Sequence, residues 1–582
     1  MLIKNTLTLF AIGILIFSCK KDDEEKEIQV ITGNLEVTVN LGDEPAIGAI
    51  VTTNPETKTL TVPQSGVVQF NAINPHTYRV NVVLPDLEDF IYFTETTVKV
   101  NETQRLVLNI PEIPELTEQA VNIGLLIDRS YQGLRNIFDA DGYISFWGDI
   151  GTDVLKANRM VNGALVNLDA YFFDPSLQTV NQVWLEHYKL IQTINQGIDL
   201  VSNPVSEIEG SQDRLLEQAE LRFLRGLLYF NLVKIYGNPV LVTTAVIDFQ
   251  NPIIFPQESV TTYNQIEEDL LFGIQHLPIT GSNVKANRNS ARALLARVYL
   301  KMAGFPVLAT NKYAAALDQL KLLVDQYELE NDYNQVFTVV NELQNKEVIF
   351  RVDFDGTENA RSKFNLNWGP MGVSEHDELV LPSGFLQDFS ATPDMFSLPI
   401  EFPVQIEDRR FFNSIATFTL VDNAIVNNSN IDFWRPLKWS NGSDNHADFA
   451  STEFDYPLLR YADVLLMLAE AENEVNGPTA LAYDAINQVR RRAFGNNDND
   501  LPQGLDKTAF FERIVIERKL ELCFEGHRKD DLIRWQKLAG VIEDYNKDID
   551  ALQKDFQPHE WVWPIPQSVL DEDANIIQNQ GY

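Results

Sequence analysis

The chain has 582 residues, more than one hydrophobic core ordinarily supports, so we expect two or more domains. A composition of 45% hydrophobic and 10% aromatic residues is that of a globular protein, and two cysteines are too few for a disulfide scaffold. The formal net charge of −37 argues against nucleic acid as a partner, because phosphate binding needs a basic field.

Residues 1–18 have the pattern of a signal peptide. Lys4 is the only charge before Cys19, and the apolar run is too short for a comfortable membrane span, although a retained anchor helix is the alternative. The stretch Ile16-Phe17-Ser18-Cys19 resembles the lipobox of bacterial lipoproteins. This resemblance implies that Cys19 is lipidated and becomes the mature N-terminus, where each buried CH₂ of an acyl chain contributes about 0.8 kcal/mol to membrane anchoring.

Residues 19–29 are a charged tether. The run KKDDEE (20–25) is too polar to pack, so it favours a solvated segment. It also resembles the charged export signal that sends some lipoproteins to the outer face of the outer membrane, and an ordinary linker is the alternative. We therefore predict a lipid-anchored protein of the outer membrane that is exposed at the cell surface.

Residues 30–112 have the pattern of an all-β domain. Leu35, Val37 and Val39 alternate with polar residues, the period of a half-buried strand. Further short strands are predicted at 49–53, 59–62, 67–70, 78–84, 91–94, 98–100 and 105–110. The spacing predicts a small β-sandwich, and the sequence resembles the regulatory-like sandwich domains of carboxypeptidases and transthyretin. It carries no evident chemistry, so we expect a stalk or adaptor, joined by a stiff Pro-containing linker to the next domain.

From residue 116 the apolar period becomes helical. Three Ala- and Leu-rich amphipathic segments, 217–239, 289–306 and 459–478, each end on a glycine followed closely by a proline. We expect Gly237, Gly304 and Gly477 to take the left-handed conformation that ends a helix. Further helices are predicted at 313–327 and 480–493, which gives pairs with the logic of a degenerate tetratricopeptide repeat.

Residues 342–455 break this pattern. They are rich in Asn, Asp, Pro, Phe and Trp and have little periodicity, and such a long irregular region within a folded domain is usually functional. The predicted fold is therefore mainly α, a degenerate tetratricopeptide-like helical stack with long loop-rich insertions, preceded by a small all-β sandwich domain.

The helical part, 116–582, resembles the RagB/SusD family of nutrient-binding outer-membrane lipoproteins. The motifs that carry the resemblance are AELRFLRGLLYFNLVKIYG (219–237), ARALLARVYLKMAG (291–304), NKEVIFRVDF (345–354), YPLLRYADVLLMLAEAENEVNG (456–477), ERKLELCFEGHRKDDLIRW (517–535) and WPIPQSVL…NQGY (563–582). The resemblance implies a non-enzymatic lid on a SusC-like TonB-dependent transporter that binds oligosaccharides, or in some members peptides. The β-sandwich departs from this pattern and leaves the tether length and lid geometry open.

The residues themselves give no sign of catalysis. The sequence has no HExxH, GxSxG or Gly-rich phosphate loop, and no His or Cys pair at metal-ligand spacing, so we expect no enzyme activity, cofactor or metal. Cys523 lies in an apolar stretch and is predicted to pack as a small hydrophobe. The motif EGHRKDDLIRW (525–535), Arg460 and Glu470 are interpreted as buried ion pairs of the scaffold.

A sugar-binding protein needs aromatic platforms beside planar hydrogen-bonding groups. Four tryptophans outside helical periodicity have such neighbours, and each could alternatively pack in the core. The predicted ligand-binding residues are Trp147, Asp149, Asp153, Asn365, Asn367, Trp368, Trp434, Arg435, Trp439 and Asn441. The acidic composition slightly favours a neutral oligosaccharide.

The sequence thus predicts a surface lipoprotein that delivers oligosaccharides to a SusC-like transporter. A peptide-binding lid of a similar transporter is the alternative function. A surface glycosidase and a purely structural adaptor are the remaining hypotheses.

Overall fold

The computed structural model describes residues 32–41, 44–54, 57–84, 87–110, 121–139, 144–158, 164–203, 208–209, 211, 213–245, 258–354, 362, 368–372, 379–390, 406–422, 424–440, 454–547, 553–573 and 575–582. The chain divides into two units, Met1–Gln119 and Ala120–Tyr582. Cys19 and the charged tether lie outside the described residues.

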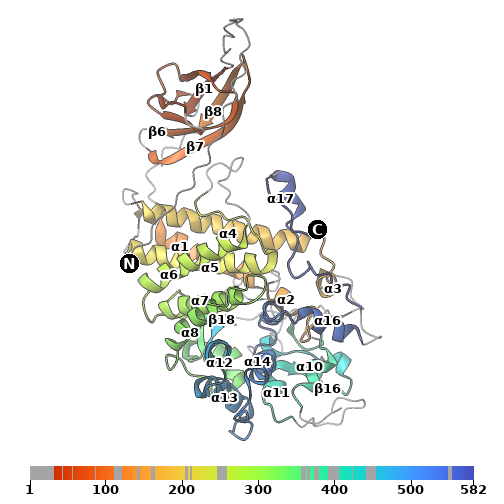
Figure 1. Ribbon diagram of the computed structural model, residues 1–582. Helices are drawn as coiled ribbons and strands as arrows, with labels where there is room; N and C mark the ends of the chain where they lie inside the picture. The colour runs from red at the N-terminus through yellow and green to blue at the C-terminus, as the bar shows by residue number, and fades with distance from the viewer. Residues whose placement is uncertain are drawn as a thin grey trace, which may run out of the picture. The chain divides into compact units, whose positions relative to one another are not determined.

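The first unit contains two four-stranded sheets (Figure 1). In one, β1 (Gly33–Leu41) pairs antiparallel with β2 (Glu44–Pro45) and β5 (Val67–Ile73) and parallel with β8 (Thr103–Ile110). The other has the order β4 (Leu60–Thr61), β3 (Ile50–Asn54), β6 (His76–Leu84), β7 (Leu87–Val98). The strand predicted at 91–94 is part of a longer strand, β7, which pairs with β6 and ends at Val98. Residues 99 and 100 of the strand predicted at 98–100 lie beyond its end.

The alternation of apolar and polar residues predicted for β1 matches the burial of its side chains in this unit. Leu35, Val37 and Val39 are fully buried, and they belong to the same hydrophobic cluster as Val51 of β3 and Val80 of β6. Inward-facing residues of both sheets therefore share one core, as the period of two requires.

The second unit is a stack of antiparallel helices (Figure 1). Each of the sequential pairs α4–α5, α5–α6, α6–α7, α7–α8 and α12–α13 packs together, and α8 also packs on α12. Their bounds are α1 (Ile123–Phe138), α4 (Gln178–Ser202), α5 (Arg214–Tyr236), α6 (Ser259–His276), α7 (Arg288–Ala303), α8 (Lys312–Lys321), α12 (Tyr461–Asn476), α13 (Ala480–Phe494) and α14 (Lys507–Glu521). The predicted fold class, a mainly α tetratricopeptide-like stack preceded in the sequence by a β region, is confirmed.

All three helices end at their predicted glycines, but only two of these glycines have the predicted left-handed backbone. Gly237 and Gly477 have φ of 72° and 82°, the positive range that favours glycine. Gly304 has φ of −91°, so its backbone is not left-handed. A Cβ at Gly304 would lie 2.6 Å from the carbonyl oxygen of Arg534, so close packing, not backbone conformation, calls for glycine there.

Shorter elements complete the second unit. The helices are α2 (Ile144–Asp149), α3 (Ala164–Asp169), α10 (Ser383–Gln387), α11 (Arg410–Ser414), α15 (Arg528–Arg534), α16 (Leu538–Asn546) and α17 (Gln567–Glu572), with 3₁₀ turns at Tyr333–Phe337, Val339–Gln344, Ile431–Phe433 and Lys438–Ser440. The strands form the pairs β9 (Val121–Asn122) with β11 (Ile208–Glu209), β10 (Lys156–Ala157) with β13 (Leu379–Val380), β12 (Val348–Val352) with β18 (Tyr456–Arg460), β14 (Ile415–Ala416) with β17 (Arg435–Pro436), and β15 (Phe418–Val421) with β16 (Ala424–Asn427).

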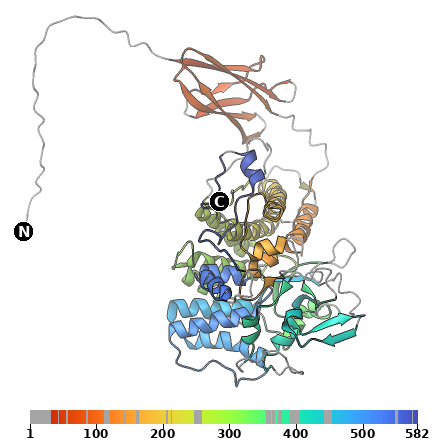
Figure 2. The same ribbon diagram turned by 90° about the vertical axis from the view of Figure 1, so that its right-hand side faces the viewer.

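The region 342–455 does not continue the helical stack. Its described parts form short helices and two-stranded ribbons, and the β15–β16 hairpin projects at the edge of the unit (Figure 2). No helix among the described residues is both long enough and apolar enough to span a bilayer.

Candidate ligand-binding region

The first predicted loop, around Trp147, is fastened to the motif at 525–535. The Asp149 carboxylate accepts hydrogen bonds from the backbone N–H of Gly526 at 2.7 Å and of Arg528 at 3.3 Å. A Cβ at Gly148 would collide with the Gly526 carbonyl oxygen, so the two backbones touch. Burial raises the pKa of Asp149 to about 7.

Asp153 contacts the same motif, 525–535, through a bidentate ion pair. Its two oxygens each lie 2.8 Å from the Arg528 guanidinium, and Lys519 lies 3.2 Å away. Burial alone would raise the pKa of Asp153, but Arg528 and Lys519 outweigh it and hold this pKa well below its usual range. Asp149 and Asp153 are therefore engaged in holding α2 against the chain near Gly526.

The structure places the four predicted tryptophans in the core. Trp147 is 2% exposed, and Trp368, Trp434 and Trp439 are fully buried. The Trp439 indole donates to the Phe524 carbonyl at 2.9 Å and stacks on Tyr456 with ring centroids 5.0 Å apart. In this conformation none of the four indoles offers a face to a sugar.

The polar residues predicted beside these tryptophans fall into two groups. Arg435 is buried, and its guanidinium donates to the carbonyl oxygens of Asp432 and Trp434 at 2.7 and 3.0 Å. Asn365, Asn367 and Asn441 lie outside the described residues. The described members of the predicted ligand-binding set thus have a structural role in the irregular region and its neighbours.

A series of aromatic side chains in contact leads from the buried Trp434 to the protein surface. The Trp434 ring lies 5.9 Å from Phe411, which contacts Phe389 at 5.6 Å on one side and Phe412 at 5.1 Å on the other. Phe412 is 46% exposed, and Phe433, next to Trp434, is 39% exposed. Sequence reasoning missed both phenylalanines, because the adjacent pair Phe411–Phe412 gives no sign of which ring points outward.

The neighbouring hairpin adds exposed aliphatic side chains. Val421 is 51% exposed, Ile425 52% and Val426 48%. Ile425 and Val426 are consecutive residues of β16, so their side chains point to opposite faces of the hairpin.

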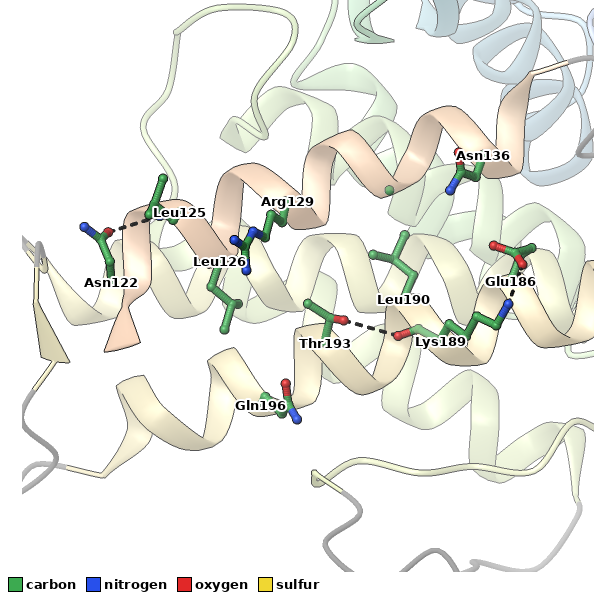
Figure 3. A pocket seen from close by; sticks show the side chains of 11 residues that line it. Asn122, Leu125, Leu126, Arg129, Asn136, Glu186, Lys189, Leu190, Thr193 and Gln196 are labelled. Atoms are coloured by element: carbon green, nitrogen blue, oxygen red, sulfur yellow. Dashed lines mark hydrogen bonds and ion pairs between the residues drawn. The ribbon is translucent and has the colours of Figure 1, made fainter. Parts of the chain in front are cut away.

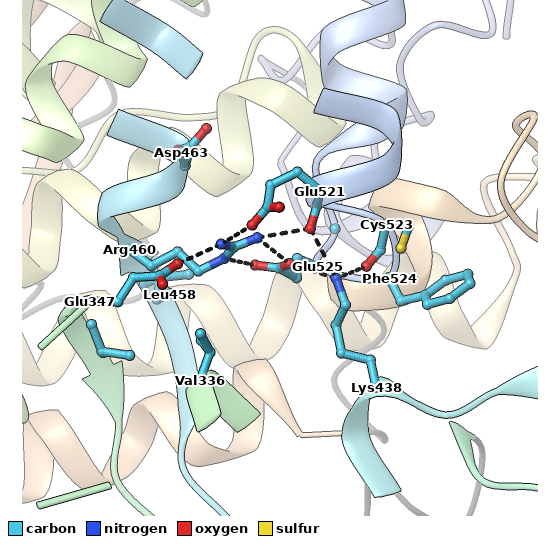
Figure 4. A network of polar contacts seen from close by, with 12 residues as sticks. Val336, Glu347, Lys438, Leu458, Arg460, Asp463, Glu521, Cys523, Phe524 and Glu525 are labelled. Atoms are coloured by element: carbon cyan, nitrogen blue, oxygen red, sulfur yellow. Dashed lines mark hydrogen bonds and ion pairs between the residues drawn. The ribbon is translucent and has the colours of Figure 1, made fainter. Parts of the chain in front are cut away.

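A buried ion-pair network anchors this region to the helical stack (Figure 4). Arg460 lies 2.8 Å from Glu347 and 2.6 Å from both Glu521 and Glu525. Lys438 reaches Glu525 at 2.7 Å, so a residue of the irregular region shares the carboxylate that Arg460 binds. The described part of the network balances the charges of Asp408, Glu347, Glu517, Glu521 and Glu525 with those of Arg410, Lys438, Arg460, Arg490 and Arg492.

The motif at 525–535 has the structural role predicted for it. Arg534 pairs with the buried Glu470, and Arg518 bridges Asp463 and Asp531 at 2.7 Å each. Cys523 is buried, and burial raises its thiol pKa to about 11, so it packs as an inert side chain.

Two family models match the helical unit. The one described as "SusD family" matches residues 419–582, and the one described as "Starch-binding associating with outer membrane" matches residues 117–300. The chain belongs to the SusD/RagB family. The β-sandwich lies outside both matched stretches.

Individual members of the family align over most of the chain. SusD-like protein P25 of Formosa agariphila is 27% identical over 474 residues, covering 75% of this chain and 87% of that protein. The starch-binding protein SusD of Bacteroides thetaiotaomicron is 24% identical over 489 residues, covering 72% of this chain and 82% of that protein.

Solved structures of the family share the fold. A SusD homologue from Bacteroides thetaiotaomicron superposes with a TM-score of 0.67 at 26% identity, covering 79% of this chain and 96% of that chain. The surface glycan-binding protein A from Bacteroides fluxus gives a TM-score of 0.63 at 20% identity, covering 79% of this chain and 99% of that chain. This second likeness establishes the fold alone.

Proposed function

We propose that this protein is a lipid-anchored, non-enzymatic surface protein that binds oligosaccharides and delivers them, as a lid, to a SusC-like TonB-dependent transporter. The observation that carries the proposal is membership of the SusD/RagB family, since one of the matching models is described as starch-binding and associated with the outer membrane. Members of this family bind nutrients and do not cleave them. A neutral oligosaccharide is slightly favoured by the net charge of −37.

The chemistry of the described residues supports binding over catalysis. A glycosidase needs two carboxyl groups facing a cleft, one of them with a raised pKa. Of the two acidic residues predicted at the site, Asp149 has a raised pKa, but its carboxyl group accepts hydrogen bonds from backbone N–H groups of the chain around Gly526. Asp153 is paired with Arg528.

We place the ligand at the irregular region, with Phe412 and Phe433 as its aromatic contacts. The predicted residues Asn365, Asn367 and Asn441 belong to the same region of the sequence and supply the amide groups that hydroxyls require. Trp368, Trp434 and Trp439 support the region from inside. Stacking on two half-exposed phenyl rings contributes little free energy, so we expect weak binding.

Affinity electrophoresis and calorimetry across neutral, sulfated and uronic glycans test the proposal. Phe433→Ala and Phe412→Ala are each expected to weaken binding of a retained glycan about two- to tenfold, the range of one aromatic contact. Phe172→Ala is the matched control, because Phe172 is 61% exposed but lies before α4, outside the irregular region. No binding across the whole panel would contradict the glycan assignment.

The anchor and the partner have tests of their own. Cys19→Ser is expected to release the protein from the outer membrane fraction, because an acyl chain supplies the membrane affinity. The wild-type protein is expected to co-purify with a TonB-dependent barrel after cross-linking on intact cells. Retention of Cys19→Ser in the membrane, with no barrel recovered, would contradict the lid.

A further inference from the structure

A cavity among the described residues lies in a groove between α1 and α4, far in sequence from the irregular region (Figure 3). Its volume is about 510 Å³, within the range of pockets that hold small ligands. The two helices run antiparallel and approach closely at two glycines. A Cβ at Gly133 would lie 2.6 Å from Leu190, and one at Gly197 would lie 2.6 Å from Leu126.

The groove combines an aliphatic floor with polar walls. Leu126 and Leu190 line it, and Leu125 at its rim is 56% exposed. Asn136 and Gln196 lie at opposite ends of the groove in Figure 3. None of the side chains that line it is aromatic, so a pyranose ring would find no stacking platform there.

One cation in the groove has no partner within the described part of the chain. Lys189 holds Glu186 at 2.7 Å, whereas the Arg129 guanidinium makes no ion pair or hydrogen bond with a described residue (Figure 3). In a chain of net charge −37, an unpaired guanidinium beside leucine side chains is a local site for a carboxylate.

We infer that this groove binds a short extended peptide that carries a carboxylate and an aliphatic side chain. The carboxylate pairs with Arg129, the aliphatic side chain lies over Leu125 and Leu126, and the amides of Asn136 and Gln196 bond the peptide backbone. From Asn122 to Asn136 the groove follows α1 for about 21 Å at 1.5 Å per residue. That length matches about six residues of extended chain.

The test uses the full-length chain and a fluorescein-labelled hexapeptide containing two leucines and one aspartate. A second peptide has asparagine in place of the aspartate. Arg129→Gln is expected to weaken the aspartate peptide about three- to fivefold, the range of an exposed ion pair, and to leave the asparagine peptide unchanged. Gln196→Trp, which fills the groove from an exposed position, is expected to weaken both peptides without changing the circular dichroism spectrum.

Arg105→Gln is the matched control, because it removes the same charge from β8 in the other unit, where its side chain is 79% exposed. An equal loss of peptide affinity in Arg105→Gln would mean that net charge, and not a site at Arg129, causes the effect. This result would overturn the inference. So would a failure of either peptide to bind at millimolar concentration. A glycan panel on the same preparation separates the two proposals. If no glycan binds while the peptides still bind, only the proposed function is overturned.

Discussion

Replacing Trp434 by alanine tests whether this indole supports the core or serves as a surface platform. Trp434 is fully buried, contacts the Phe411 ring at 5.9 Å and donates its indole N–H to the Asn428 carbonyl at 2.8 Å. Truncating a buried tryptophan leaves a large cavity and typically costs about 3–5 kcal/mol. The lost hydrogen bond adds about 1 kcal/mol and leaves a carbonyl to be satisfied otherwise.

The measurement is urea unfolding followed by far-UV circular dichroism, which reports on the helical unit. We expect Trp434→Ala to lower the free energy of unfolding by about 3–5 kcal/mol, a large fraction of the stability of a typical domain. Phe433→Ala, one position earlier and 39% exposed, is the control and is expected to cost under about 2 kcal/mol. A Trp434→Ala protein of unchanged stability that has lost glycan binding would refute the assignment of this indole to the core.

Three further substitutions test contacts that hold segments of the second unit together. Arg460→Met leaves three buried glutamates without their shared cation, so urea unfolding is expected to show a loss of about 3–5 kcal/mol. Burial raises the pKa of Asp149 from 3.8 to about 7, so between these values the folded protein keeps a proton that the unfolded chain releases. The contribution of Asp149 to stability is therefore lost as the pH rises through about 7, and Asp149→Asn should flatten this part of the dependence of the thermal midpoint on pH. Gly148→Ala should lower the thermal midpoint because its Cβ meets the Gly526 carbonyl, whereas Gly384→Ala, with nothing within 4 Å of its Cβ, should not.

Each of these substitutions has an outcome that contradicts its reasoning. An Arg460→Met protein as stable as wild type would mean that the glutamates do not depend on this guanidinium. A pH profile of Asp149→Asn parallel to that of wild type would assign the dependence to another group. Equal thermal midpoints for Gly148→Ala and Gly384→Ala would mean that α2 does not touch the chain near Gly526.

The sequence predicted elements well where their cause is local. The helices expected at 217–239, 289–306 and 480–493 are α5, α7 and α13, because apolar periodicity and a terminal glycine or proline act within one turn. The helix expected at 459–478 begins two residues later, at Tyr461. Residues up to Arg460 are instead drawn into β18 by pairing with β12, a partner more than a hundred positions away.

Side-chain burial could not be predicted in the same way. The glycines and asparagines beside Trp368, Trp434 and Trp439 resemble those of an exposed loop, yet these indoles are fully buried. Whether an aromatic side chain faces water depends on what folds over it, and those residues come from distant parts of the chain. The exposed ring beside Trp434 is Phe433, which no local pattern distinguishes.

By itself, the sequence determined the class of the protein through a β period of two, a helical period with glycine stops, and the motifs of a family. These features are local or compositional, so they can be read along the chain. Only the tertiary structure decided which side chains are buried, which carboxylates share Arg460, and that α1 and α4 enclose a groove in which Arg129 pairs with no described residue. Those properties arise from contacts between residues far apart in sequence, which become neighbours only when the chain folds.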